Sequence, residues 1–238
     1  MSDESSAEQR RIYEDSAAEY DELISAEDAD GEIVRALTGV ASFEGATVAD
    51  VGAGTARLSR LLTANSAWVD LVDRALPMLA LGGRRLELLG RTNFALHEAD
   101  ARELPLASNR YDIVMAGWVF GHFRHWMPEG WREEVARGVD EMSRIAKPRG
   151  QVFVLETLGT GHEEPRRHGP LEEYYAVLES TGFARRWIRT DYVFADVDTA
   201  ARVTGRFFGE DFSERVRENA WARVPECTAI FSRIAPEA

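Results

Sequence analysis

The sequence predicts an α/β fold, in which a doubly wound and mostly parallel sheet is covered by helices on both faces. Three observations support this prediction. Short apolar runs of strand length alternate with helical patterns from residue 47 to residue 178. A glycine-rich turn, Gly52-Ala53-Gly54, follows the first of these runs. The chain has 238 residues, of which 45% are hydrophobic and 29% charged, and is long enough to bury its own core.

Two helices are expected before the first strand. Apolar and aromatic side chains recur every three or four residues in the segment 10–24, which contains Tyr13 and Tyr20. The segment 31–40 has the same spacing, and Asp30 is a candidate N-cap for it. We interpret residues 1–9 as a flexible tail and residues 10–238 as a single domain.

Seven segments are candidate strands. Five lie in the alternating part of the chain, at residues 47–51, 68–72, 93–97, 111–116 and 151–156. Two more, at residues 187–195 and 228–234, follow it. Right-handed crossovers connect parallel strands, so the carboxyl ends of the first five strands should share one edge, where ligands bind in such folds.

Helical patterns connect these strands. They occur after the glycine-rich turn and at residues 77–89, 129–145, 171–180 and 199–221, the last interrupted near residues 205–209. The sequence Lys147-Pro148-Arg149-Gly150 ends the long helix at residue 145. Residues 159–169 are rich in glycine, histidine and proline, so we expect a loop there.

The composition excludes several kinds of protein. Cys227 is the only cysteine, so neither a disulfide within the chain nor a multi-cysteine metal site can form, and we expect no metal. The formal net charge of −13 disfavours nucleic acid and anionic membranes as partners. No stretch of about 18 apolar residues occurs and no apolar leader follows the polar first residues, so we expect a cytoplasmic protein.

The glycine-rich turn and the acids around it predict a cofactor that contains adenosine. Gly52 and Gly54 let the backbone approach a ligand closely, and Asp73 can accept hydrogen bonds from two ribose hydroxyls. Two features favour S-adenosylmethionine over a dinucleotide. Arg57 replaces the last glycine of the dinucleotide pattern G-x-G-x-x-G. The carboxylate of Asp50 suits a ligand that carries an ammonium and a sulfonium.

Five motifs follow one another in the order and spacing of a known family. They are Val48-Ala49-Asp50-Val51-Gly52-Ala53-Gly54-Thr55-Ala56, then Leu71-Val72-Asp73, Glu98-Ala99-Asp100-Ala101, Tyr111-Asp112-Ile113-Val114-Met115-Ala116 and Arg144-Ile145-Ala146-Lys147-Pro148-Arg149-Gly150-Gln151. Over residues 10–160 the chain resembles the class I S-adenosylmethionine-dependent methyltransferases, in particular their small-molecule, methyltransferase-11/25-like members. It departs from the family at Ala56, where glycine is usual, and at Gly121, where many small-molecule members have histidine.

The resemblance implies a Rossmann-like sheet of seven strands with an antiparallel C-terminal strand, and residues 10–45 as an N-terminal helical lid. It implies S-adenosylmethionine as the cofactor and S-adenosylhomocysteine as its product. In the family pattern Asp50 orients the methionine ammonium, Asp73 binds the ribose and Asp100 binds the adenine amino group. The cofactor-binding candidates are Tyr13, Tyr20, Asp50, Gly52, Ala53, Gly54, Asp73, Arg74, Met78, Asp100, Ala101, Ala116, Gly117 and Trp118.

Methyl transfer from a sulfonium is an in-line displacement, which depends mainly on proximity and alignment. A general base contributes where the acceptor must lose a proton. The catalytic candidates are His122, Glu156 and Tyr20, with Tyr13 beside them, since all are expected near the cofactor edge of the sheet. The aromatic residues after the fourth strand predict an apolar pocket for a small-molecule acceptor: Trp118, Phe120, Phe123, Trp126 and Trp131.

Other interpretations of the same residues stay open. Asp50 can cap the turn after its strand, and Asp100 can be the N-cap of a helical turn. The glycine at position 121 and the absence of an obvious base also suit a non-catalytic module that binds S-adenosylmethionine. A NAD-dependent oxidoreductase is the alternative enzyme. The acceptor atom is not identified by the sequence, and both a monomer and a homodimer agree with it.

Overall fold

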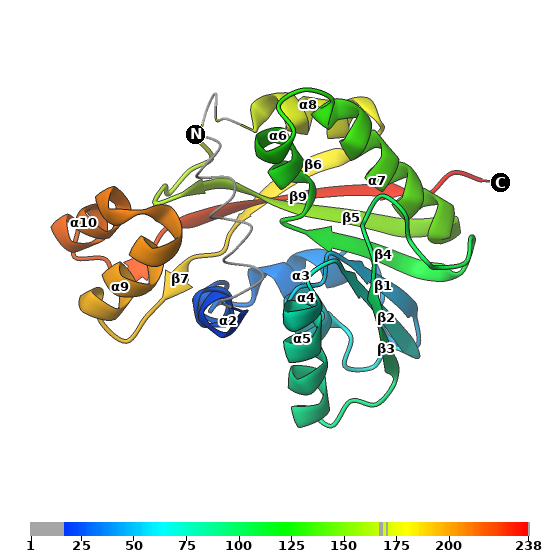
Figure 1. Cartoon of the computed structure of the whole chain (residues 1–238), viewed down its shortest axis with the longest axis horizontal. Helices are drawn as coiled ribbons and strands as arrows, with labels where there is room; N and C mark the ends of the chain where they lie inside the picture. The colour runs from blue at the N-terminus through cyan, green and yellow to red at the C-terminus, as the bar shows by residue number, and fades with distance from the viewer. Residues whose placement is uncertain (1–16, 167–168, 170, 238) are drawn as a thin grey trace.

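The computed structural model describes residues 17–166, 169 and 171–237. Its largest feature is a seven-stranded sheet with the strand order β3-β2-β1-β4-β5-β9-β6 (Figure 1). The first five strands pair in parallel, and β9 lies antiparallel between β5 and β6. The expected fold class, with its antiparallel C-terminal strand, is confirmed. The strands are β1 (Thr47–Val51), β2 (Trp68–Asp73), β3 (Phe94–Glu98), β4 (Tyr111–Gly117), β5 (Ala146–Thr160), β6 (Ala184–Arg189) and β9 (Glu226–Ile234).

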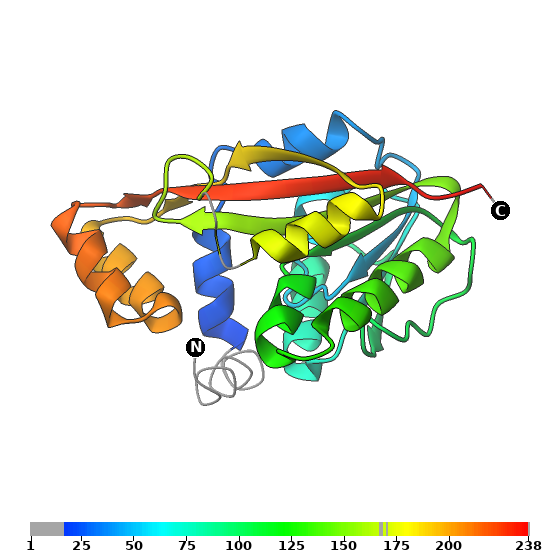
Figure 2. The same ribbon diagram turned by 90° about the horizontal axis from the view of Figure 1, so that it is seen from above.

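Helices cover both faces of the sheet (Figures 1 and 2). Ile113 and Met115 of β4 point into one apolar core, and Val114 and Ala116 point into the other. Because both faces are covered, the central strands are apolar at nearly every position. One face carries α3 (Glu32–Thr38), α4 (Arg57–Leu62) and α5 (Leu76–Leu88), and the other carries α6 (Phe123–Trp126), α7 (Trp131–Ile145) and α8 (Glu172–Ser180), with the short 3₁₀ helix η1 (Phe120–His122) before α6.

A smaller unit stands beside the main sheet, and we call its residues 190–225 the cap. It contains α9 (Val197–Phe208), α10 (Glu210–Glu218) and a two-stranded sheet of β7 (Tyr192–Val193) and β8 (Arg223–Val224). The helix α2 (Ala17–Ala26) contacts both α9 of the cap and α5 of the main unit (Figure 2). Leu23 of α2 shares a third apolar core with the buried residues of the cap.

The expected strand at residues 187–195 is divided between the two sheets. In the main sheet β6 ends at Arg189, which pairs with Cys227 of β9. The carboxylate of Asp191 then accepts a hydrogen bond from the backbone N–H of Glu226, at 3.1 Å. This contact turns the chain out of the main sheet, so Tyr192 begins a separate strand.

Two further boundaries differ from expectation. The strand β5 continues through a bulge to Thr160 and so occupies the first part of the predicted loop at residues 159–169. The N-cap predicted at Asp30 is wrong. The carboxylate of Asp28 accepts hydrogen bonds from the backbone N–H groups of Glu32, at 2.7 Å, and Ile33, at 3.1 Å.

The predicted tail at residues 1–9 and the candidate Tyr13 lie outside the described residues. Of the lid expected at residues 10–45, the structure describes α2, α3 and the segments that join them to β1.

Candidate active site

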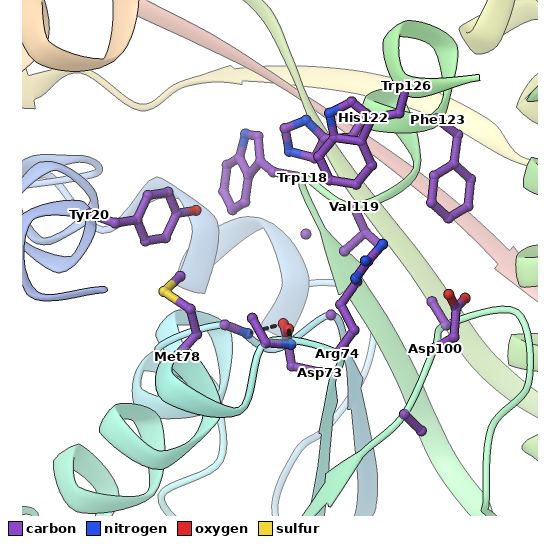
Figure 3. A pocket seen from close by; sticks show the side chains of 16 residues that line it. Tyr20, Asp73, Arg74, Met78, Asp100, Trp118, Val119, His122, Phe123 and Trp126 are labelled. Atoms are coloured by element: carbon purple, nitrogen blue, oxygen red, sulfur yellow. Dashed lines mark hydrogen bonds between the residues drawn. The ribbon is translucent and has the colours of Figure 1, made fainter. Parts of the chain in front are cut away.

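A cavity opens at the carboxyl ends of β1, β2 and β4, and we call it the first cavity (Figure 3). Tyr20 of α2 and Met78 of α5 line one side of it, while Trp118, His122 and Trp126 line the other. It brings together ten of the predicted cofactor residues. The lining residues are Tyr20, Gly52, Gly54, Asp73, Arg74, Ala75, Met78, Ala99, Asp100, Ala101, Gly117, Trp118, Val119, His122, Phe123 and Trp126.

The glycine-rich turn forms the base of the first cavity. Gly52 has a φ of 67°, and a Cβ atom there would stand 2.3 Å from Cγ2 of Val119, so only glycine meets both conditions. Ala56, where the resemblance expects glycine, also has a positive φ, of 62°. The left-handed turn before α4 is therefore preserved, at a cost of about 1–2 kcal/mol for a residue with a Cβ atom.

Asp73 braces this turn from the end of β2. One carboxylate oxygen accepts a hydrogen bond from the backbone N–H of Gly54 at 2.7 Å, and the other accepts one from Ala75 at 2.8 Å (Figure 3). Burial raises the pKa of Asp73 above its ordinary value. A carboxylate oxygen has more than one lone pair, so Asp73 can hold the turn and still accept hydrogen bonds from a bound ligand.

Asp50 lies behind the turn and is buried. Its carboxylate accepts hydrogen bonds from the backbone N–H of Ser59, at 3.2 Å, and from the Ser59 hydroxyl, at 2.6 Å. Burial raises the pKa of Asp50 to about 7. These contacts have the geometry of the capping alternative, since they fasten α4 to β1. Asp50, Ala53 and Ala116 are not among the residues that line the first cavity, so any effect they have on a ligand there acts through the backbone.

Asp100 lines the far end of the first cavity and is held by Arg102. The guanidinium of Arg102 donates to both carboxylate oxygens of Asp100, at 2.8 and 2.7 Å, and also to Glu134 at 2.5 Å. This hydrogen bonding lowers the pKa of Asp100. The backbone N–H of Arg102 also donates to Asp100, at 2.9 Å, which is the capping geometry that the sequence left open. The carboxylate is therefore ionised and fixed in orientation.

The aromatic residues after β4 divide between cavity and core. Trp118, Phe123 and Trp126 line the first cavity, whereas Phe120 and Trp131 are buried in the core. Trp118 has a φ of 57°, a strained backbone conformation of the kind that concentrates at functional sites. The ring of Trp126 stacks on the ring of His122, with centroids 4.9 Å apart.

A second cavity adjoins the first, and we call it the second cavity. Tyr20, Trp118 and His122 line both cavities. Its wall is completed by α2, α9, the end of β5 and Tyr192 of the cap. Its lining residues are Tyr20, Leu23, Ile24, Glu27, Arg57, Trp118, His122, Thr157, Thr160, Tyr192, Phe207 and Phe208.

The three catalytic candidates occupy different positions. Tyr20 and His122 lie at the junction of the two cavities. Burial, aided by the neighbouring His125, lowers the pKa of His122 to about 4, so its imidazole is neutral at pH 7 and able to accept a proton. Burial raises the pKa of Tyr20, which keeps its phenol protonated.

Glu156 lies behind Gly121 and is not among the residues lining either cavity. Its carboxyl oxygen accepts hydrogen bonds from the backbone N–H of Gly121, at 3.1 Å, and from the hydroxyl of Tyr174, at 2.9 Å. Burial raises its pKa to about 7. This position indicates a structural part for Glu156.

The sequence argument missed three lining residues of the first cavity and most of those of the second. Ala75, Ala99 and Val119 each adjoin a residue that it selected, so their position at the ends of strands was an available signal. Arg57 entered the argument only as a departure from a glycine pattern, whereas it lines the second cavity.

Two absences apply to the described part of the chain. Among residues 17–166, 169 and 171–237, no group of three or more histidine, cysteine, aspartate or glutamate side chains could hold a metal ion. Within the same residues, a helix with the length and apolar character needed to cross a membrane is not found.

Comparison with known proteins supports the fold. Residues 49–154, which run from β1 into β5, match the family model described as a methyltransferase domain. This match agrees with the resemblance of the sequence motifs to class I S-adenosylmethionine-dependent methyltransferases. The matched part of this methyltransferase domain contains all but Tyr20 of the residues that line the first cavity.

Two curated relatives align with this chain over part of their length. The chain is 34% identical over 117 residues to the demethylmenaquinone methyltransferase of Clavibacter sepedonicus, which covers 49% of this chain and 43% of the relative. It is 25% identical over 181 residues to the demethylmenaquinone methyltransferase of Bacillus velezensis, which covers 75% of this chain and 62% of the relative. The chain therefore spans about two-fifths to three-fifths of the length of these relatives.

Solved structures share the fold at low sequence identity. A SAM-dependent methyltransferase from Aquifex aeolicus superposes with a TM-score of 0.54 and 18% identity, over 97% of this chain and 98% of that one. The phosphoethanolamine N-methyltransferase 2 of Haemonchus contortus, solved with phosphomonomethylethanolamine and S-adenosylhomocysteine, superposes with a TM-score of 0.55 and 14% identity, over 87% of this chain and 52% of that one. Of the twelve residues that line the second cavity, only Arg57, Trp118 and His122 fall within the family match.

Proposed function

We propose that this protein transfers the methyl group of S-adenosylmethionine to a small-molecule acceptor. The observation that carries the proposal is the pair of adjoining cavities with Tyr20, Trp118 and His122 as their common wall. The cofactor occupies the first cavity and the acceptor occupies the second. The methyl group then crosses the junction between them.

The chain's own residues suit each part of the cofactor. Asp73 accepts hydrogen bonds from the ribose hydroxyls while it holds Gly54 through a backbone N–H. Asp100, fixed by Arg102, accepts from the adenine amino group, and the Ala101 backbone faces the ring. Gly52 and Gly117 lie against the methionine part. When bound, the cofactor supplies an electrophilic methyl group on a positively charged sulfur.

Tyr20, Trp118 and His122, which line both cavities, orient the reacting groups, and His122 also accepts the proton released by the acceptor. Alignment of the sulfur, the methyl group and the acceptor atom can supply about 7–11 kcal/mol of the barrier. The sulfonium loses its charge as the new bond forms, so an anion-stabilising site is not needed. Neutral His122 accepts the proton that a hydroxyl or amine acceptor releases. Its lowered pKa makes it a weaker base than an ordinary imidazole, so its contribution lies at the lower end of about 10²–10⁴-fold in rate.

The helix α2 is proposed as the lid over the two cavities, because it supplies Tyr20 to both of them. Asp21 on the next position holds the helix closed. Its buried carboxylate accepts hydrogen bonds from Thr55 at 3.0 Å and Arg60 at 3.1 Å, and forms an ion pair with Arg85 at 2.6 Å. These partners lie directly after the glycine-rich turn, on α4 and on α5. The turn and α5 also line the first cavity.

The names of the relatives suggest two acceptor types. The curated relatives named above act on demethylmenaquinone, and a further relative from Zea mays, 24% identical over 116 residues, is a phosphoethanolamine N-methyltransferase. Both acceptors are small molecules, which supports the acceptor class proposed here. We also propose a cytoplasmic enzyme that works as a monomer or homodimer. The acidic composition and the single cysteine support the location.

Calorimetric titration with S-adenosylhomocysteine tests the proposal. We expect wild-type protein to bind it, and Asp73→Asn to bind it more than tenfold more weakly, because hydrogen bonds to a charged group are lost. The matched control is Glu87→Gln on the exposed face of α5, which should bind as wild type does. Wild-type protein that binds NADH and not S-adenosylhomocysteine would instead support an oxidoreductase. Tight binding without turnover of any acceptor would support a non-catalytic module.

A further inference from the structure

Arg57 forms the polar floor of the second cavity. The side chain is buried, and its Nη1 donates to Glu27 Oε2 at 2.6 Å. The guanidinium carbon stands 4.4 Å from the centre of the Trp118 ring. Among the residues that the structure describes, Nη2 of Arg57 is buried without a hydrogen-bond partner. A buried N–H group without a partner is costly, so an oxygen that reached it from the cavity would be stabilised there.

The charge of Arg57 is already balanced. Glu27, which also lines the cavity, is buried beside it and accepts a second hydrogen bond from Thr190, at 3.1 Å. Glu226 is buried nearby and accepts a hydrogen bond from Thr157, another lining residue, at 2.5 Å. Burial raises the pKa of Glu226 to about 8. The positive charge of Arg57 is therefore not available to neutralise an anionic ligand in the second cavity.

Because the charge of Arg57 is neutralised by Glu27, only some ligand groups are suited to accept a hydrogen bond from Nη2. A carboxylate or phosphate would be buried close to Glu27 without a cation of its own, which is strongly unfavourable. An ammonium would meet the hydrogen-bond donors of Arg57. An uncharged oxygen that only accepts, such as a carbonyl, satisfies Nη2 and leaves the ion pair with Glu27 intact.

Apart from Thr157 and Thr160, the rest of the second cavity is apolar and aromatic. Leu23 and Ile24 of α2 face it from one element, and Phe207 and Phe208 of α9 from another, with the Trp118 ring beside the guanidinium. His122 lies at the end next to the first cavity. A flat apolar body fits between these groups, with its reacting atom near His122 and its oxygen at Arg57.

We infer that the acceptor is an uncharged, largely aromatic molecule that places a carbonyl oxygen on Nη2 of Arg57, at the end away from the atom that is methylated. This inference rests on the proposed function and names its acceptor class. Charged acceptors of the same size, including phosphorylated amines, are disfavoured by the same floor.

Three phenols of matched size test the inference on the wild-type protein. They are 4-hydroxyacetophenone, 4-hydroxybenzoate and tyramine, which present an uncharged carbonyl, a carboxylate and an ammonium opposite the same hydroxyl. Each is titrated calorimetrically into protein saturated with S-adenosylhomocysteine. We expect 4-hydroxyacetophenone to bind at least tenfold more tightly than the other two, because it alone fills the unpaired N–H group without an uncompensated charge. Equal affinities, or tighter binding of a charged probe, would overturn the inference.

Arg57→Lys separates the hydrogen bond from the charge. Lysine keeps the positive charge beside Glu27 but lacks the second amino group, so 4-hydroxyacetophenone should lose about tenfold in affinity. Arg84→Lys on the exposed face of α5 is the control and should bind both ligands as wild type does. Unchanged probe affinity in Arg57→Lys would contradict the inference. Titration of S-adenosylhomocysteine without a probe tests the proposed function separately. If wild-type protein does not bind it, the proposed function is contradicted. If it binds but the probes do not differ in affinity, only the inference about the acceptor is contradicted.

Discussion

The carboxyl group of Glu156 fills the space that a side chain at position 121 would need. A Cβ atom on Gly121 would stand 3.0 Å from Oε2 of Glu156, while the backbone N–H of Gly121 donates to Oε1 at 3.1 Å. The two residues therefore depend on each other. The glycine that departs from the histidine of many small-molecule methyltransferases is explained by a buried carboxyl group rather than by loss of catalysis.

We expect Gly121→Ala to lower the free energy of unfolding by about 1–3 kcal/mol, because the added methyl group overpacks the contact with Glu156. Urea unfolding measures the effect. In a double-mutant cycle, Gly121→Ala should cost much less in a Glu156→Ala background, where the carboxyl group is absent. The control is Gly169→Ala, where the nearest atom to a new Cβ is 3.7 Å away. Additive costs in the cycle would show that the two positions are independent.

Buried carboxyl groups should make the protein less stable as the pH rises from about 4 through about 8. Asp50 and Glu156 have pKa values of about 7 in the folded protein, and Glu226 has one of about 8, against about 4 for such groups when unfolded. The folded state holds more protons than the unfolded state between these values. Their stabilisation is therefore complete below about pH 4 and is lost as the pH rises through about 7 to 8. His122, whose pKa is lowered to about 4, acts in the opposite direction, but only below about pH 6.5.

Urea unfolding at about pH 6.5 and about pH 8.5 checks this window. His122 is about half protonated in the unfolded state at the lower pH, so it offsets a small part of the change. The free energy of unfolding should fall between the two values. Glu156→Gln should reduce the fall, because the amide does not titrate and its oxygen can still accept from Gly121 and Tyr174. Because Glu156 is away from both cavities, the same variant should keep wild-type affinity for S-adenosylhomocysteine. A variant as sensitive to pH as wild type would assign the effect to other groups.

His122→Gln should lower the rate of methyl transfer by a factor at the lower end of about 10²–10⁴-fold when the acceptor releases a proton. Wild-type turnover should stay high well below pH 6.5, because the pKa of His122 is about 4 and the imidazole remains neutral there. Initial rates across the pH range measure both effects. Affinity for S-adenosylhomocysteine reports whether the first cavity is intact in the variant. A rate in His122→Gln close to wild type would assign the proton to another acceptor.

Asp21→Asn should loosen α2 from the rest of the molecule. The carboxylate is buried between Arg60 and Arg85, so removal of its charge should cost about 3 kcal/mol in unfolding free energy. It should also weaken S-adenosylhomocysteine binding, since Tyr20 moves with the helix. Glu22→Gln is the control, because the ion pair of Glu22 with Arg202 is exposed and contributes about 0–1 kcal/mol. Equal effects of the two variants would argue against α2 as a lid.

The fold could be predicted because its signals are local. The alternation of strand and helix, the glycine-rich turn after β1 and the acid at the end of β2 are each contained in a few neighbouring residues. The division of residues 187–195 between two sheets could not be predicted in this way. It depends on the contact of Asp191 with Glu226, which lies 35 residues further along the chain.

The first cavity is formed by residues with local sequence signals, whereas the second depends on contacts between residues far apart in the sequence. Most lining residues of the first cavity follow the ends of successive parallel strands, so topology alone places Asp73, Asp100 and Trp118 together. The second cavity is assembled from α2, β5 and the cap. The partner of Arg57 is Glu27, 30 residues earlier, and no local pattern indicates this pair. The same limit explains Glu156, whose end-of-strand position suggested a base although its carboxyl group is turned toward Gly121.

The pairing of Arg189 with Cys227 gives the cap the properties of an exchangeable module. The chain leaves the main sheet and re-enters it at adjacent points of one antiparallel pair, so 190–225 is joined to the sheet in the manner of a long hairpin loop. Its length and sequence can change during evolution while the register of β6 and β9 is kept. The family match ends well before this segment, at residue 154. A chimera that replaces the cap but keeps the contacts of α9 with α2 should therefore alter which molecules are methylated while the first cavity is kept.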